Sequence, residues 1–468
     1  MKLTSYGAVD GVTGSCHLLE INNKQILLDC GIFQGGRTAR EDNEADFVFD
    51  VKQIDVVIVS HAHLDHIGRL PLLKKRGFTG RIVSTRPSFE LARISLLDSA
   101  KLLENEAARF NRKKTADQPP AKPMYDDEDV LDTMDVWREF HVYKETFDVC
   151  EGVKATFHDA GYILGSAYVE LDLVEGGETR KFIFSGDLGN SDKPIIHDPS
   201  TPPHADVVVM ESTYGDRDHR PFQSSVDELL EAVEEAAKRR GNVIIPTFAL
   251  ERAQELLYVL YEAWRDGRLP KSVEIYLDSP MAISATRIFE RHPDIYDAEA
   301  MALHDAGETP FDFDALRYTR ETRDSMKINE IQSGAIILAG SGMATGGRVV
   351  HHLMHNLGRS ECTVVFCGYQ AYGTLGRHIV DGAEFATIYG KNIPINAKIL
   401  TVNGFSAHAG QKELTAWAKS TQAKNIFLVH GEDDSKIALA KHLLKETDTK
   451  NIKNLEFGKT IDFLTLPR

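Results

Sequence analysis

Four side chains of metal-binding type fall within six residues of this sequence. They are His61, His63, Asp65 and His66, and they directly follow the apolar run IDVVIVS. Alternate residues of an extended segment point the same way, so His61 and His63 can converge on one ion. Asp65 and His66 follow after a bend and can face a second ion. Imidazole and carboxylate ligands together suit zinc or a similar divalent transition metal.

One loop cannot complete two metal sites, so further ligands must come from elsewhere in the chain. Candidates lie where apolar strands end in polar residues: Asp187 in FIFSGDLGN, Glu211 in VVVMESTYGD, His408 in NGFSAHAG and His430 in NIFLVHGED. Singly, an aspartate beside glycine is more often a turn residue and a strand-end histidine more often a surface residue. Together they indicate ligands collected from one edge of a sheet.

The elements that must position these residues change in type along the chain. Residues 1 to about 97, 153–187 and 205–213 hold short apolar runs that predict strands. From about residue 216, strands alternate with long helices, which predicts a parallel sheet covered on both faces. Short elements return after about residue 399. Residues 98–140 are typical of a charged helix, a Pro-rich break and an acidic helix. This pattern predicts a surface insertion, which is either a cover near a cleft or a flap without function.

Composition narrows the class of protein. A chain of 468 residues is expected to form two or three domains. The net charge of −16 argues against a protein that coats nucleic acid through bulk charge, but it does not exclude a nuclease. No apolar run reaches the roughly 18 residues of a membrane helix, and no secretory signal is visible. The five scattered cysteines indicate reduced thiols. We therefore expect a cytoplasmic protein without a membrane partner.

Five motifs in this order resemble those of a known family. HAHLDH, SGDLG, ESTYGD, GFSAHAG and LVHGE resemble the metallo-β-lactamase superfamily and, more narrowly, its β-CASP branch of nucleases. The resemblance implies a metallo-β-lactamase αββα sandwich over residues 1–215 and 399–468. A β-CASP α/β domain with a mainly parallel sheet, residues 216–398, would interrupt it. It also implies a zinc-dependent ribonuclease that cleaves single-stranded RNA, with an endonucleolytic mode expected and a homodimer left open.

The resemblance assigns site residues one by one. Asp29 would orient the histidine loop from behind the ligands. His408 would donate a proton to the leaving oxygen with Glu211 supporting it, and Asp65 counts with these two as catalytic. The first metal would be bound by His61, His63 and Asp187, and the second by Asp65, His66, Asp187 and His430.

One position departs from the family pattern. The first metal normally gains a histidine from an AGHxLG segment, but here DAGYILGSA places Tyr162 at that position. A neutral phenol is a poor zinc ligand, because its ionisation near pH 7 needs a large pKa shift. His158 lies four residues earlier and is expected to be too far away to replace it. We therefore expect one or two zinc ions, with the first site weakened.

A glycine-rich segment, SGMATGGRVVHHL, falls between a predicted strand and a predicted helix. In isolation it predicts a plain turn, but within the family resemblance it predicts a substrate phosphate site at a helix N-terminus. Two other functions stay open for the whole chain: a different metallo-β-lactamase ester hydrolase, and an RNA-binding or complex-forming protein with a degraded metal site. The predicted phosphate-binding residues are Ser341, Gly342, Gly346, Gly347, Arg348 and Arg377.

Overall fold

The computed structural model describes residues 1–35, 38–115 and 118–467. The chain divides into two compact units, and residues 192–197 and 219–407 form the second of them. The first unit comprises residues 1–191, 198–218 and 408–468. The predicted fold class, a mixed α/β domain interrupted by a second α/β domain with a parallel sheet, is confirmed. The predicted domain boundaries after residues 215 and 398 stay predictions.

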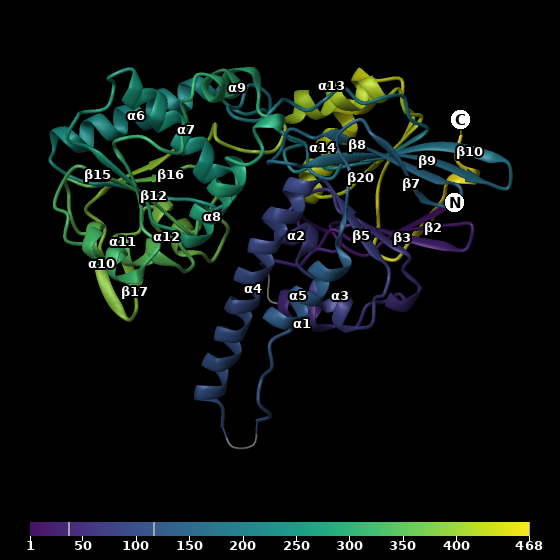
Figure 1. Ribbon diagram of the computed structural model, residues 1–468, viewed down its shortest axis with the longest axis horizontal. Helices are drawn as coiled ribbons and strands as arrows, with labels where there is room; N and C mark the ends of the chain where they lie inside the picture. Colours follow the sequence, from purple (N-terminus) through teal and green to yellow (C-terminus); the bar gives the residue numbers. More distant parts are fainter. Residues whose placement is uncertain (36–37, 116–117, 468) are drawn as a thin grey trace. The chain divides into compact units, whose positions relative to one another are not determined.

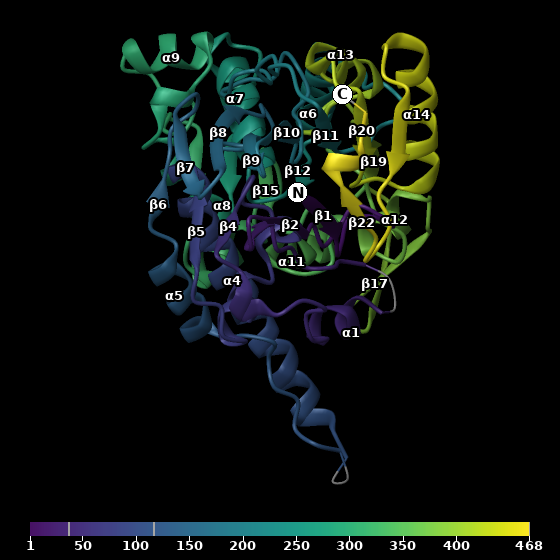
Figure 2. The ribbon, with the colours of Figure 1, turned by 90° about the vertical axis from the view of Figure 1, so that its right-hand side faces the viewer.

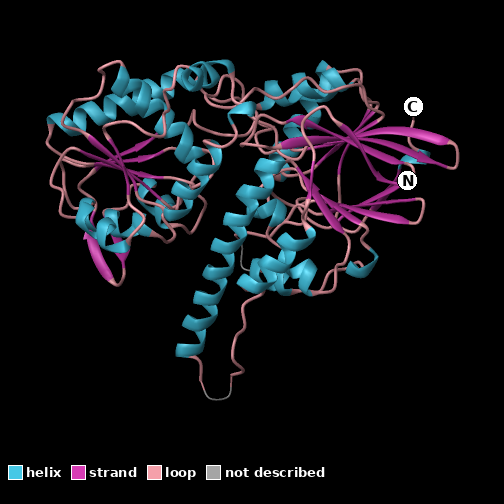
Figure 3. Ribbon diagram, viewed as in Figure 1, coloured by secondary structure: helices cyan, strands magenta, loops and turns pink. Residues whose placement is uncertain are grey.

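Two seven-stranded sheets form the centre of the first unit (Figures 1 and 3). The first sheet contains, in spatial order, β22 (Thr460–Asp462), β1 (Lys2–Ser5), β2 (His17–Ile21), β3 (Lys24–Leu28), β4 (Val56–Ile58), β5 (Arg81–Ser84) and β6 (Glu139–Phe140). The second contains β21 (Asn451–Asn454), β20 (Asn425–Leu428), β11 (Val207–Met210), β10 (Glu178–Phe184), β9 (Ala167–Glu175), β8 (Val153–Asp159) and β7 (Thr146–Cys150).

In each sheet, the strands that lead to the predicted ligands run parallel to one another. In the first sheet β3, β4 and β5 run parallel, and in the second β10, β11 and β20 do so. Their carboxyl ends therefore lie at one edge of each sheet. Val56 and Phe182 belong to the core between the sheets, whereas Ile183 belongs to the core on the outer face of the second sheet. This alternation is what a strand buried on both faces requires.

Helices cover the outer faces of the two sheets, which gives the expected αββα order (Figures 1 and 2). Leu414 and Leu443 join the apolar core on the outer face of the second sheet. The charged helix predicted at the start of residues 98–140 begins earlier, at Arg86, where the Thr85 hydroxyl caps it by accepting a hydrogen bond from the Ser88 amide. The helical segments are α1 (Ala39–Glu44), η1 (Val51–Gln53), α2 (Leu64–Ile67), α3 (Leu70–Lys75), α4 (Arg86–Lys113), α5 (Asp127–Val136), α13 (Gln411–Thr421), α14 (Asp433–Glu446) and η3 (Phe463–Thr465).

The insertion predicted for residues 98–140 consists of the second half of α4, a connection and α5. Ala116 and Asp117, in the predicted Pro-rich break, lie outside the described residues. Asp126 and Asp129 form a reciprocal capping box that starts α5. The two alternatives for this segment, a cover and a flap without function, stay predictions.

The second unit is built on a six-stranded sheet in which every pairing is parallel, as predicted. Figure 1 shows α6 and α7 on one face of this sheet and α11 and α12 on the other. The strands in spatial order are β14 (Leu316–Tyr318), β13 (Glu274–Leu277), β15 (Ala335–Ala339), β12 (Val243–Pro246), β16 (Thr363–Phe366) and β19 (Lys398–Thr401), with β17 (Phe385–Ile388) and β18 (Lys391–Pro394) forming a separate hairpin. The helical segments are α6 (Phe222–Lys238), α7 (Arg252–Arg265), α8 (Pro280–Phe289), η2 (Pro293–Ile295), α9 (Ala298–Asp305), α10 (Thr322–Ile328), α11 (Arg348–Asn356) and α12 (Leu375–Val380).

No helix in the described part of the chain is both long enough and apolar enough to cross a membrane.

Candidate metal centre

The histidine loop is held in place by the turn that follows β3. His61 and His63 follow β4, and Asp65 and His66 lie in the short helix α2. The amide of Cys30 donates to the carbonyl of His66 at 2.8 Å. At Gly31, a Cβ atom would stand 1.5 Å from the carbonyl oxygen of Asp65. Only glycine therefore permits this close contact, which supports the loop from behind.

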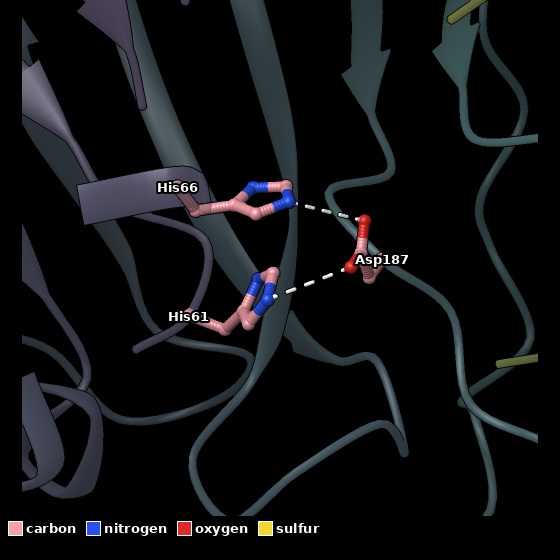
Figure 4. A group of neighbouring side chains, drawn as sticks. All are labelled: His61, His66 and Asp187. Carbon is pink, nitrogen blue, oxygen red and sulfur yellow. Dashed lines mark ion pairs between the residues drawn. The ribbon is translucent and has the colours of Figure 1, made fainter. Parts of the chain in front are cut away.

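Two imidazoles of this loop point at the two oxygens of one carboxylate (Figure 4). His61 Nε2 lies 3.6 Å from Asp187 Oδ2, and His66 Nε2 lies 3.3 Å from Asp187 Oδ1. From the end of β20, His430 places Nδ1 3.5 Å from Asp187 Oδ1 and Nε2 3.5 Å from Asp65 Oδ2. The structure thus gathers five predicted ligands from three strand ends, with Asp187 at their centre.

These side chains form overlapping groups whose ligand atoms lie within 4.8 Å of one another. The imidazole of His63 belongs to none of these groups within the described residues. Its ring centroid lies 5.1 Å from that of His61, so it borders the cluster. The division into a His61–His63–Asp187 site and an Asp65–His66–Asp187–His430 site stays a prediction. The groups are His61, His66 and Asp187; Asp65, His66 and His430; and Asp187, Glu211 and His408.

The donor set fits a divalent metal ion. In the part of the chain that the structure describes, His61 Nε2 and Asp187 Oδ1 are buried and make no hydrogen bond. Buried acceptors without a hydrogen bond are unfavourable by about 1–3 kcal/mol each, and native proteins hold few of them. A cation between these atoms would satisfy both. Neutral imidazole and carboxylate together are also ligands that zinc prefers.

The surroundings of three side chains, His61, His63 and Asp187, favour the protonation states that bind metal. Burial, with the neighbouring His66, holds the pKa of His61 well below its usual value. Burial alone would raise the pKa of Asp187, but the imidazoles of His430, His66 and His61 outweigh it and hold the pKa well below the usual value. Burial also lowers the pKa of His63 to about 4. His61 and His63 are thus neutral and Asp187 is ionised near pH 7, as metal binding requires.

Asp29, which follows β3, contacts the histidine loop through both of its carboxylate oxygens. The supporting role that the resemblance assigns to it stays a prediction. Its Oδ2 accepts a hydrogen bond from His66 Nδ1 at 2.6 Å and from the hydroxyls of Ser60 at 2.9 Å and Ser15 at 3.2 Å. Its Oδ1 accepts from the amide of Ser60 at 2.8 Å. Because Nδ1 of His66 is bound to Asp29, Nε2 is the nitrogen left to face Asp187. Asp29 thus fixes the ring orientation of His66.

Tyr162 stands beside the histidines of the first predicted site. Its ring packs edge-on against His61 at 5.0 Å and against His63 at 5.2 Å between centroids. Its hydroxyl lies 3.0 Å from His408 Nε2. Burial, followed by the nearby Asp187, raises the pKa of Tyr162 well above its usual value, so the phenol is neutral.

His158 lies apart from the ligand cluster. Its Nε2 lies 2.8 Å from a carboxylate oxygen of Glu170, and its ring stacks on Tyr168 with centroids 4.8 Å apart. These contacts give His158 a structural role within the second sheet.

His408 and Glu211 form a pair next to Asp187, in which Glu211 is fully buried and His408 is half-buried. His408 Nδ1 donates to Glu211 Oε1 at 3.0 Å. Glu211 is held in turn by the amides of Leu188 at 2.8 Å and Thr213 at 3.2 Å. Burial by itself would lower the pKa of His408, but Glu211 outweighs this effect and raises the pKa. The imidazole is therefore stabilised in its proton-carrying form.

Two residues of the centre were not among the predicted ones. The hydroxyl of Thr213 lies 3.0 Å from His430 Nδ1, and the hydroxyl of Ser60 lies 3.1 Å from His61 Nδ1. Ser60 directly precedes HAHLDH, and Thr213 lies inside ESTYGD. Their position beside or within the motifs is the signal that could have identified them.

The two arginines predicted to bind substrate phosphate make ion pairs within the second unit. Arg348 donates to Asp278 Oδ1 and to the Thr319 carbonyl, both at 2.7 Å. Arg377 pairs with Asp381 at 2.7 Å.

The remaining predicted phosphate residues form the loop between β15 and α11. The hydroxyl of Ser341 lies 3.1 Å from that of Thr345 within this loop. Gly342, Gly346 and Gly347 also lie there, before the first residue of α11. The phosphate-binding role of this loop stays a prediction.

Three family models match successive parts of the chain. Residues 9–147 match the metallo-beta-lactamase superfamily, residues 253–379 the Beta-Casp domain, and residues 392–454 the Zn-dependent metallo-hydrolase RNA specificity domain. Ribonuclease TTHA0252 of Thermus thermophilus is 41% identical over 95% of this chain and 96% of its own length. The chain belongs to the β-CASP branch of the metallo-β-lactamase superfamily.

Other relatives of this β-CASP chain are more distant. Transcription termination factor FttA of Methanosarcina mazei is 31% identical over 97% of this chain and 71% of its own length. Endoribonuclease ysh1 of Schizosaccharomyces pombe is 29% identical over 92% of this chain and 54% of its own length. A crystal structure of a protein of unknown function from Enterococcus faecalis V583 superposes with a TM-score of 0.52 at 11% identity, over 98% of this chain and 99% of that one, which shows a shared fold.

Proposed function

We propose that this protein is a zinc-dependent ribonuclease that hydrolyses phosphodiester bonds in single-stranded RNA, with an endonucleolytic mode of cleavage. The observation that carries the proposal is the His408–Glu211 pair, whose histidine Nδ1 lies 4.0 Å from Asp187 Oδ2 in the centre of the metal-ligand cluster. A proton donor next to a metal-binding carboxylate suits phosphodiester hydrolysis. The match to an RNA specificity domain and the 41% identical ribonuclease support RNA as the substrate.

Each residue of the metal centre has a separate role in the proposed reaction. Zinc, when bound, lowers the pKa of a coordinated water molecule and stabilises negative charge on phosphate oxygens. Glu211 holds His408 by Nδ1, so Nε2 is the atom that gives a proton to the departing 3′ oxygen, once substrate displaces the Tyr162 hydroxyl that lies 3.0 Å from it. One product therefore carries a 5′ phosphate. Asp29 fixes the orientation of His66 throughout.

We propose further that Tyr162 weakens the first metal site. Its neutral phenol packs on His61 and His63, where the family supplies a histidine, and its hydroxyl faces His408. Three protein ligands with an open position still describe many catalytic zinc sites, so hydrolysis is retained in this proposal. The number of zinc ions, one or two, and the formation of a homodimer stay open predictions.

The test is cleavage of a 5′-labelled single-stranded RNA by purified protein supplied with zinc. Asp187→Ala should abolish cleavage, and His408→Ala should lower kcat by about 10²–10⁴-fold because the leaving oxygen loses its proton donor. His158→Gln is the matched control, because His158 contacts Glu170 and Tyr168 rather than the cluster, and it should cleave like the wild type.

The same assay separates the alternatives. RNA binding without cleavage by the wild type would favour a binding protein with a degraded site. Unchanged cleavage by Asp187→Ala would contradict the proposed chemistry outright. Hydrolysis of a thioester without hydrolysis of RNA would place the protein with the other hydrolases of the superfamily.

A further inference from the structure

Three exposed aromatic side chains lie at the carboxyl edge of the parallel sheet in the second unit, and the metal centre does not use them. Phe248 follows β12, and Tyr369 and Tyr372 follow β16, its neighbour in the sheet. Their exposed fractions are 46%, 61% and 96%. Rings this exposed add little to the stability of the core, because burial of apolar area is what stabilises a fold. We call Phe248, Tyr369 and Tyr372 the aromatic platform.

The loop between β15 and α11 ties the members of the platform together. The ring of Phe248 lies so close to Gly342 that a Cβ atom there would stand 2.8 Å from it. Gln370, between the two tyrosines in sequence, is buried and donates from Nε2 to the carbonyl of Gly342 at 3.0 Å. Phe248 and the loop that carries the two tyrosines therefore both contact Gly342, which brings the two segments close together.

The surroundings of the platform select a ligand class. Carboxyl ends of parallel strands are where open α/β sheets bind ligands. The amino end of α11, at Arg348, follows the same glycine-rich loop, and the positive end of the helix dipole there favours an anion, although the Val349 amide already donates to the Gly340 carbonyl at 3.1 Å. Flat apolar rings beside an anion-favouring loop match a nucleotide, which carries a planar base and a phosphate. The faces of aromatic rings stack on any base, since every base has a π face.

We propose that the aromatic platform stacks unpaired nucleobases of an RNA strand. The proposal rests on the ribonuclease function proposed above and adds a site for the bases, distinct from the metal ligands. Bases inside a duplex already stack on one another, so the platform selects single-stranded segments. Binding is tolerant of sequence, because stacking does not read the hydrogen-bonding edges of the bases.

The test measures binding apart from cleavage. Metal-free protein in EDTA is titrated with a fluorescent strand of ten adenosines and with a strand of equal length and charge whose sugars carry no bases. Tyr369→Ala and Tyr372→Ala should each raise the Kd for the adenosine strand about tenfold. Neither should change the Kd for the abasic strand. Tyr372→Phe keeps the ring and should bind adenosine strands like the wild type.

Phe385→Ala is the matched control. Phe385 is 54% exposed in the same unit, but it lies on the β17–β18 hairpin rather than on the strand-end loops. Its loss should leave both Kd values unchanged. Melting temperatures of all variants verify that they are folded. Because the tyrosines are exposed, their replacement should leave the melting temperature unchanged, so a lowered value would identify a folding defect.

Two results would overturn the platform. Equal Kd values for wild type and both tyrosine variants would show that the rings do not contact the strand, and equal losses on adenosine and abasic strands would show that they do not contact bases. The proposed function is tested by a different measurement, the cleavage of RNA in the presence of zinc. If the wild-type protein binds adenosine strands through these tyrosines but cleaves no RNA, the hydrolase function is refuted and the platform is supported. If the wild-type protein binds no RNA, both the ribonuclease function and the aromatic platform are refuted.

Discussion

Replacement of Asp29 by asparagine tests whether this residue sets the metal affinity of the centre. An asparagine would keep the shape of the side chain and suits the left-handed backbone at this position, where φ is 59°. The change therefore alters charge and hydrogen bonding with little effect on the backbone. Asp29 itself is fully buried, so water cannot replace the contacts that are lost.

The structure shows why the amide cannot satisfy its neighbours. Asp29 Oδ1 accepts from the Ser60 amide, and Oδ2 accepts from His66 Nδ1. An asparagine has one oxygen, so its NH₂ group must face one of these two donors. If it faces His66, Nδ1 must accept and the proton moves to Nε2, the nitrogen that should bind metal. If it faces Ser60, two buried donors oppose each other, which is unfavourable by about 1–3 kcal/mol.

Loss of such a partner typically weakens metal affinity by about 10–100-fold, or about 1.4–2.7 kcal/mol. The assay is competition for zinc between the protein and a chromophoric chelator, with the stability of the metal-free protein followed by urea unfolding. Asp55→Asn is the control, because the Asp55 carboxylate binds the Lys24 ammonium and the Gln25 amide at the other end of the strands. A zinc Kd for Asp29→Asn within twofold of wild type would refute this reasoning, and so would an equal loss in Asp55→Asn.

Three more predictions concern the metal and the second unit. Tyr162→His should raise the zinc content of the protein, measured by mass spectrometry of metals, because an imidazole replaces a neutral phenol beside His61 and His63; unchanged stoichiometry would show that this position does not reach the first site. Chelation should stop RNA cleavage and added zinc should restore it, and cleavage that persists without metal would contradict the assignment. Burial would raise the pKa of Asp278, but hydrogen bonds from His352, Ser325 and Thr319 lower it to about 2. Its folded pKa lies below the unfolded value of about 3.9, so about 2–3 kcal/mol of stability is present above pH 4 and is lost as the pH falls from about 4 to about 2. Asp278→Asn should remove that part of the acid dependence in unfolding curves, and an unchanged pH profile would show that Asp278 does not contribute it.

The fold is predictable where hydrophobic patterns are strong. The parallel sheet of the second unit follows from fully buried runs such as β12 and β15 between long helices. Strands β21 and β22 are not predicted by their own residues, because these are mostly exposed or half-buried and obtain their pairing from distant partners. Helix α4 begins earlier than predicted, although its start signal, Thr85 before Arg86 and Pro87, is visible in the sequence.

The residues of the candidate site are predictable where they directly follow a strand that the hydrophobic pattern indicates. His66, Asp187 and His430 follow from the rule that ligands gather at the carboxyl ends of strands. The contacts of Arg348 could not be read from the chain, because Asp278 lies 70 residues away and nothing local indicates that the two will pair. The packing of Tyr162 on two histidines likewise depends on how separate loops meet, which residue spacing does not record.

The long sequence separation between residues of the metal centre has a consequence during synthesis of the polypeptide chain. His66 and His430 approach within 3.3 Å although 364 residues separate them. A ribosome builds the chain from the amino end, so a nascent protein carries the histidine loop long before it carries the last imidazole. The ligand set closes only when the carboxyl-terminal strands have emerged and joined the sheets begun at the other end. Any premature stop before β20 therefore yields a polypeptide that has most of the motifs but lacks His430, so its ligand set stays incomplete.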